Sequence, residues 1–168
     1  MNGVSEQEFQ RLLSVAELRS GECMEEKLEA DEGECFAIAG RLGILSVDSL
    51  IAELQLFRDL TGDVNLRGRL VADIAQACVV TLDPVAQRVV TNIFQRFSAR
   101  NDDEEETEED PIEPIVEDEI EVGDVIVQNL ALSLDAYPRV PKAVFEEVDD
   151  EAGKATGPFA ALSALRGD

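Results

Sequence analysis

The sequence predicts an α+β fold in which an antiparallel sheet, with a meander at its core, packs against two or three helices. Three observations favour this fold class. Apolar and polar residues alternate over residues 48–58 and again over 64–80, which is typical of strands with one buried face. The segment DLTGD at 59–63 has the Asp and Gly residues of a turn. Residues 32–42 and 122–134 instead show apolar residues at helical spacing.

The first thirty residues are expected to form two short strands, at 7–13 and 22–29. Between them, SVAEL at 14–18 is interpreted as one turn of helix with Ser14 as its cap.

A helix is predicted at 32–42. Asp31 can accept a hydrogen bond from an early backbone N–H, and Glu34 follows three residues later, which resembles a capping box with Asp in the cap position. Gly43 fits the left-handed conformation that closes a helix.

The two alternating runs and their five-residue turn predict an antiparallel hairpin. One face of it is apolar, and the other carries Arg67, Arg69 and Asp73. Asp83-Pro84 marks a second turn, and the β-branched and aromatic residues of 86–98 predict a third strand that completes the meander.

Charge is concentrated in one stretch. The whole chain has 37 Asp and Glu against 14 Lys and Arg, a net charge of −23, and residues 101–121 alone hold 13 acidic residues and no basic one. Such a block repels itself, so we expect residues 100–118 to form a disordered acidic loop. It is either an inert spacer or an acidic arm for a basic partner.

The C-terminal third is expected to hold the last helix of the domain and a tail. Residues 122–134 suit a helix, with a strand at 120–127 as the alternative because Val and Ile lower helix propensity. We expect one domain over 1–145 and a flexible acidic tail over 146–168. The tail ends in PFAALSALR, where Phe159 and Leu162 belong to a short helical motif that is either a docked terminal helix or a partner-binding element.

Composition narrows the function classes. The chain has no His, which removes the commonest general base and zinc ligand. It has no phosphate-binding glycine loop, no recognisable signal peptide and no apolar run long enough to span a membrane. Three Cys without a CxxC pair do not suggest a disulfide framework. We therefore expect a non-enzymatic cytoplasmic protein without a cofactor, and no contact with membrane or DNA.

Two candidate sites remain. Arg67, Arg69 and Arg88 lie on the polar face of the predicted sheet, where they make either cross-strand pairs with Asp73 or Glu53 or a local contact with an RNA backbone. Cys78 ends an apolar run, and a lone Cys there is usually a small core residue.

The series EADEGECFAIAGRLGILSVDSLIAELQL, VNLRGRLVADIAQACVVTLDPV and DEIEVGDVIVQNLALSLDAYPR resembles the YceD-like family of large ribosomal RNA subunit accumulation proteins, in its alphaproteobacterial branch. The resemblance spans about residues 8–140. It implies a bacterial factor that helps large-subunit ribosomal RNA to accumulate or be processed.

Many members of that family carry a CxxC where this chain has Cys78 and, at the second position, Thr81. One thiolate without His or a second Cys cannot fill a tetrahedral zinc site, so we expect no metal here. The segments that resemble the family most specifically add Pro84, Tyr137 and Pro138 as candidates for partner binding.

The sequence therefore predicts a ribosome-biogenesis accessory factor. Its partner would be a basic ribosomal protein or a large-subunit assembly particle, with RNA contact possible but indirect. The alternatives are an acidic nucleic-acid mimic that inhibits a DNA- or RNA-binding protein, and a metal or redox protein built around Cys78. An enzyme is the weakest of the hypotheses.

Overall fold

The structure is a computed structural model that describes residues 9–99 and 112–141. In chain order its elements are β1 (Leu12–Ser14), β2 (Cys23–Glu29), α1 (Glu32–Leu42), β3 (Ser46–Arg58), β4 (Val64–Ala77), β5 (Pro84–Ser98), β6 (Ile112–Pro114), β7 (Glu119–Glu121) and α2 (Gly123–Leu132). The fold is α+β, as the sequence predicts.

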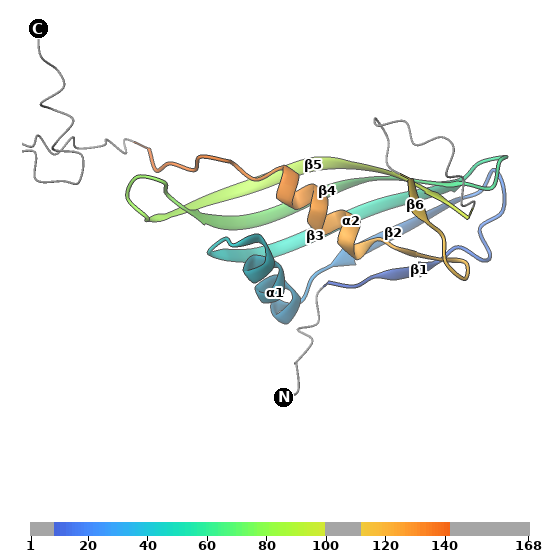
Figure 1. Cartoon of the computed structure of the whole chain (residues 1–168), viewed down its shortest axis with the longest axis horizontal. Helices are drawn as coiled ribbons and strands as arrows, with labels where there is room; N and C mark the ends of the chain where they lie inside the picture. The colour runs from blue at the N-terminus through green and yellow to red at the C-terminus, as the bar shows by residue number, and fades with distance from the viewer. Residues whose placement is uncertain (1–8, 100–111, 142–168) are drawn as a thin grey trace, which may run out of the picture.

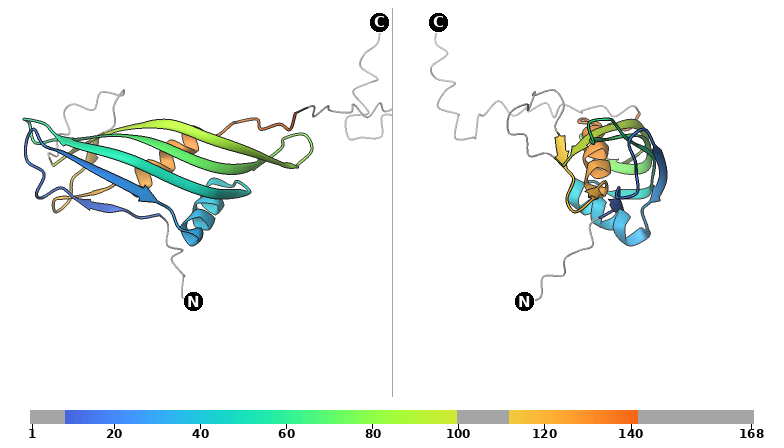
Figure 2. Two further views of the ribbon diagram at one scale, coloured as in Figure 1. Left: turned by 180° about the vertical axis from the view of Figure 1, so that it is seen from behind. Right: turned by 90° about the vertical axis from the view of Figure 1, so that its right-hand side faces the viewer.

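The main sheet has the strand order β2-β3-β4-β5-β6. Strands β2 to β5 are antiparallel neighbours, which confirms the meander, and β6 adds a short parallel pairing to the end of β5. Strands β1 and β7 form a separate antiparallel pair. Both helices lie on one side of the main sheet, and Figure 2 shows the opposite side uncovered by either helix.

The hydrophobic core lies between the sheet and the helices (Figure 1). Alternate side chains of each long strand point inward, so the period-two pattern of the sequence becomes one buried face. Its largest fully buried members come from the strands and from both helices: Ile38, Leu50, Leu54, Leu56, Leu66, Leu70, Ile74, Ile93, Phe97, Ile120, Ile126 and Leu130. Helix α1 packs on β3, and α2 packs on β4 and β5.

The predicted cap of α1 is confirmed. The Glu34 N–H donates to Asp31 Oδ1 at 2.8 Å, and the Asp31 N–H donates to Glu34 Oε2 at 2.9 Å, which completes the capping box. Gly43 closes the helix with φ +65°, in the left-handed region. Glu34 also binds the Arg11 guanidinium through both carboxylate oxygens, which ties the N-terminal segment to α1.

The strand predicted at 7–13 is found only at its end, as β1 at Leu12–Ser14; residues 9–11 are not in a strand, and residues 7 and 8 lie outside the described range. The prediction of a helical turn at 14–18 capped by Ser14 is wrong, because only a single tight turn forms there, in which the Leu18 N–H donates to the Val15 carbonyl at 3.2 Å. Ser14 pairs with Glu119 of β7, and the Val15 N–H donates to the Asp118 carbonyl at 2.8 Å. The backbone of Ser14 and Val15 therefore bonds to Glu119 and Asp118, more than one hundred residues away, and is not available for a helical turn.

Part of the predicted acidic loop is ordered. Residues 100–111 lie outside the described part of the chain, but Ile112–Pro114 forms β6, and the loop prediction is wrong there. Ile115 packs against the core, and its N–H donates to the Ser98 carbonyl at 2.9 Å. Apolar residues between the acids therefore anchor the second half of this stretch.

The helix predicted at 122–134 is α2, and the alternative strand is confined to β7 before it. Gly123 begins α2 where the N-terminal segment crosses it. A Cβ at this position would lie 2.1 Å from the Phe9 carbonyl oxygen and 2.9 Å from the Arg11 nitrogen. Only glycine permits this close approach.

Neither helix in residues 9–99 and 112–141 has the length and apolar character needed to cross a bilayer.

Candidate functional site

The first candidate site is the outer sheet face, defined as the side chains of β2 to β5 that point away from the core. Along β4 these are the odd-numbered residues, and the strand register fixes their neighbours. Arg67 lies between Gln55 of β3 and Phe94 of β5. In the next row, Arg69 lies between Glu53 and Asn92.

Arg67 and Arg69 are exposed, as the sequence predicts for the polar face of β4. The Arg67 guanidinium lies over the Phe94 ring, with its Cζ 5.8 Å from the ring centroid. Such a cation–π contact orients the guanidinium without neutralising its charge. Within the described residues neither arginine has an ion-pair partner, although Glu53 faces Arg69 in the register.

Arg88 makes the cross-strand pair that the sequence suggests. Its Nη1 lies 3.8 Å from Asp73 Oδ1, and both side chains are partly exposed. Asp73 also accepts a hydrogen bond of 3.0 Å from the Ser49 hydroxyl. A pair of this length and exposure contributes little to stability.

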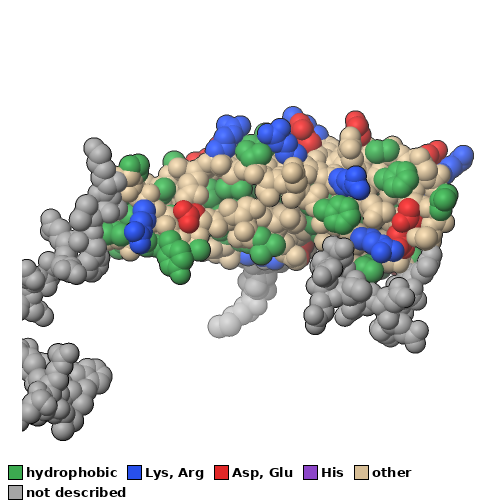
Figure 3. Space-filling model, turned by 90° about the horizontal axis from the view of Figure 1, so that it is seen from above, with side chains coloured by type: hydrophobic (Ala, Val, Ile, Leu, Met, Phe, Trp, Pro, Cys, Tyr) green, Lys and Arg blue, Asp and Glu red, His purple; other side chains and the backbone are tan. Residues whose placement is uncertain are grey.

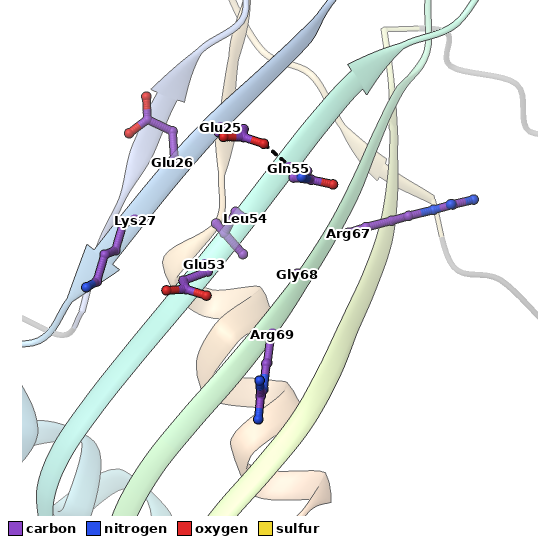
Figure 4. A pocket seen from close by; sticks show the side chains of 9 residues that line it. All are labelled: Glu25, Glu26, Lys27, Glu53, Leu54, Gln55, Arg67, Gly68 and Arg69. Carbon is purple, nitrogen blue, oxygen red and sulfur yellow. Dashed lines mark hydrogen bonds between the residues drawn. The ribbon is translucent and has the colours of Figure 1, made fainter.

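A groove of about 580 Å³ lies on this face over β2, β3 and β4. Its lining consists of Glu25, Glu26, Lys27, Glu53, Leu54, Gln55, Arg67, Gly68 and Arg69 (Figure 4). Gln55 Nε2 donates to Glu25 Oε1 at 2.9 Å, which fixes one wall. Gly68 also lines the groove, and a Cβ there would point toward the core, 2.6 Å from Leu54 Cδ2.

Charge divides the outer sheet face into two halves. The β2 and β3 half carries Glu25, Glu29 and Glu53 with one cation, Lys27. The β4 and β5 half carries four arginines, Arg67, Arg69, Arg88 and Arg96, with Asp73 paired to Arg88 and Asp63 paired to Arg96. In the view from the β5 side, Lys and Arg side chains lie next to hydrophobic ones (Figure 3).

The second candidate site is the hairpin end, where β4 turns into β5. The Cys78 N–H donates to the Asp83 carbonyl at 2.8 Å, and Pro84 begins β5 opposite Ala77. The chain that leaves α2 returns to this turn, since the Val79 N–H donates to the Pro138 carbonyl at 2.9 Å. The structure thus brings Cys78, Thr81, Pro84, Tyr137 and Pro138 to one end of the sheet.

Cys78 is buried within this turn, as expected for a small core residue. The side chain and the N–H of Thr81 both hydrogen-bond its sulfur, the latter at 3.5 Å. These bonds lower the pKa of the Cys78 thiol to about 7, although burial opposes the shift. Thr81, which stands where many family members have the second Cys of a CxxC, therefore contacts Cys78 at the first position.

Several exposed hydrophobic residues of these two surfaces are not among the candidates predicted from the sequence. Phe94 and Phe57 are 51% and 44% exposed on the outer sheet face. At the hairpin end Val79 and Leu82 are exposed, and Leu82 has φ +64°. The positions of Phe94 and Phe57 could have been found, because each alternates with buried residues of its own strand. The positive φ of a leucine has no signal in the sequence.

No group of three Cys, Asp or Glu side chains in the described ranges could hold a metal ion together. Phe159 and Leu162 lie outside those ranges.

The sequence model of the family described as "Large ribosomal RNA subunit accumulation protein YceD" matches residues 66–166. This chain belongs to the YceD family. The match begins in β4 and takes in both β5 and α2, so it covers the arginine-bearing half of the outer sheet face and the whole hairpin end. No curated protein and no solved structure matches the chain.

Membership of the YceD family links the chain to the accumulation of large-subunit ribosomal RNA, as the sequence resemblance implies. The family model matches from residue 66 onward, whereas the resemblance seen in the sequence begins at about residue 8. Strands β1 to β3 therefore lie outside the range that the family model matches.

Proposed function

We propose that this chain is a non-enzymatic accessory factor that promotes the accumulation or processing of large-subunit ribosomal RNA. It acts in the cytoplasm by binding a basic ribosomal protein or a protein–RNA assembly intermediate. The observation that carries this proposal is the YceD match over residues 66–166.

The charge of the chain supports a cation-rich partner. The net charge is −23, and residues 101–121 contribute 13 acidic residues without a compensating base. Ribosomal proteins present the opposite charge, and attraction of this kind accelerates encounter while remaining sensitive to salt.

The test is deletion of the gene in its own host. We expect a lower ratio of large- to small-subunit ribosomal RNA and fewer mature large subunits in a sucrose gradient, with both restored by a plasmid copy. Unchanged RNA levels and normal subunit profiles would contradict the proposal.

Affinity purification of the full chain identifies the partner. We expect ribosomal proteins or pre-ribosomal RNA at about 50 mM salt and their loss at about 500 mM, since salt screens charges beyond a few ångströms. Recovery of a polymerase or nuclease subunit instead would favour the nucleic-acid mimic, which the same acidic residues could support.

A further inference from the structure

We infer that the outer sheet face binds single-stranded RNA along β4 and β5, with bases stacked on Phe94 and Phe57 and phosphates held by Arg67, Arg69 and Arg88. This inference rests on the proposed function and deepens it, because it makes the RNA contact direct.

The first argument is the exposure of two flat apolar rings on one face. Phe94 is 51% exposed and Phe57 44% exposed, while Ile93 and Leu56, their neighbours in sequence, are buried. Bases stack on such rings in proteins that bind single strands, whatever the base, since every base has a π-face.

The second argument is charge complementarity. Counting only described residues, the β4 and β5 half of the face carries four arginines, of which Arg88 pairs with Asp73 and Arg96 with the buried Asp63, a local charge of 4 − 2 = +2 on a chain of net charge −23. Arg67 and Arg69 occupy adjacent rows of β4, beside the Phe94 ring. Physiological salt screens charges over about 8 Å, which limits the repulsion from acidic residues that lie farther away than this.

The third argument is the chemistry around the ring. The exposed Asn92 lies opposite Arg69 and two residues from Phe94. Its amide can both donate to and accept from a base edge. In a single strand both the edges and the faces of the bases are accessible to protein side chains. In a duplex the pairing edges and the stacked faces are hidden.

The acidic residues of the outer sheet face limit where on that face RNA can bind. Glu25, Glu29 and Glu53 lie on the β2 and β3 half of the face, where they would repel phosphates. The RNA strand therefore follows β4 and β5, reaches β3 only at Phe57 near the end of that strand, and does not enter the centre of the groove in Figure 4. Glu53 lies directly opposite Arg69, so Glu53→Gln should tighten binding.

The experiment is fluorescence anisotropy with the full chain and a fluorescein-labelled 12-nucleotide polyuridine RNA at 50 to 200 mM KCl. We expect Phe94→Leu to weaken binding by about 5- to 100-fold, because it keeps an apolar side chain but removes the stacking surface. Phe94→Tyr keeps the ring and should bind like the wild type. The matched control is Phe36→Leu, which changes an exposed ring on α1, away from this face.

Salt dependence tests the arginines separately. Arg67→Gln and Arg69→Gln should each reduce the slope of log affinity against log salt by about 0.7, the value for one phosphate contact on a single strand. Arg19→Gln removes an exposed charge from the loop between β1 and β2 and should leave the slope unchanged. Circular dichroism confirms that each variant is folded.

Absence of saturable binding by the wild type at 50 mM KCl would overturn the inference, as would equal losses in Phe94→Leu and Phe36→Leu. Equal affinity for a duplex of the same length would also overturn it. If RNA fails to bind but the deletion strain still loses large-subunit RNA, this inference falls and the proposed function stands. If the deletion strain is normal but RNA binds, the proposed function falls alone.

Discussion

The Ser98 hydroxyl donates a hydrogen bond of 2.8 Å to Oδ1 of Asp63, so the end of β5 is fastened to the residue that precedes β4. The Arg96 guanidinium binds the other oxygen, Oδ2, with Nε at 3.0 Å. Burial alone would raise the pKa of the Asp63 carboxyl, but the hydrogen bonds from Arg96 and Ser98 lower it below its ordinary value. The charged Asp63 carboxylate is thus a junction, because it joins the start of β4 to the end of β5 at the edge of the core.

This junction predicts a pH dependence. A carboxyl whose pKa is lower in the folded state stabilises the fold above its unfolded pKa, about 3.9. That stabilisation disappears as the pH falls through the folded value. We expect Asp63→Asn to lower the free energy of unfolding by about 1–3 kcal/mol at pH 7 and to flatten its decline below pH 4. Urea titrations at a series of pH values measure both effects.

The matched control is Asp73→Asn, which changes a carboxylate that is 42% exposed in its pair with Arg88. An exposed pair of this kind contributes about 0–1 kcal/mol. Equal effects of the two substitutions would refute the role given to Asp63.

The contact at the start of α2 predicts opposite results for two glycines. Gly123→Ala places a methyl group against the Phe9 carbonyl, so we expect a loss of about 1–3 kcal/mol. Gly40→Ala places one in open space on α1, where it should add about 0.5–1 kcal/mol. Thermal unfolding compares the two variants. A stable Gly123→Ala protein would mean that the N-terminal segment does not pack there.

The capping box predicts that Asp31→Ala destabilises the fold by about 1 kcal/mol, because the Glu34 N–H loses its acceptor. Asp31→Asn keeps an oxygen in the same place and should recover most of the loss. Chemical denaturation measures the difference. An Asn variant as unstable as the Ala variant would mean that charge at the helix terminus, rather than the hydrogen bond, matters.

The Cys78 turn predicts an unusually acidic thiol. In a Cys23→Ser and Cys35→Ser background, thiolate absorbance near 240 nm should rise with a midpoint at about pH 7. Thr81→Val removes the hydroxyl and should raise this pKa, whereas Thr81→Ser should not. Because an ordinary thiol titrates at about 8.5, Cys78 adds stability as the pH rises from about 7 to 8.5, and this gain is absent below the folded pKa. A midpoint unchanged by Thr81→Val would exclude the hydroxyl as its cause.

The parts of the fold that local patterns determine could be predicted from the sequence. Alternation along β3 and β4 identified the buried face, and Asp31, Glu34 and Gly43 placed both ends of α1. The pairing of β1 with β7 could not be predicted, because its two strands have three residues each and lie more than one hundred residues apart.

The candidate sites were predicted in part. Arg67 and Arg69 lie on the face where alternation put them, but Phe94 became a candidate only when the register placed it opposite Arg67. Likewise, Pro138 is near Cys78 because the chain folds back after α2, a tertiary contact that no local pattern encodes.

The hydrogen bond between Val79 and Pro138 has a consequence for the reach of the protein. It holds residue 138 at the hairpin end, from which the chain continues into residues 142–168, whereas it enters residues 100–111 from the far end of β5. Fifteen residues of extended strand separate these two exits by about 45 Å. A single partner that contacts the chain at both exits must therefore span about 45 Å.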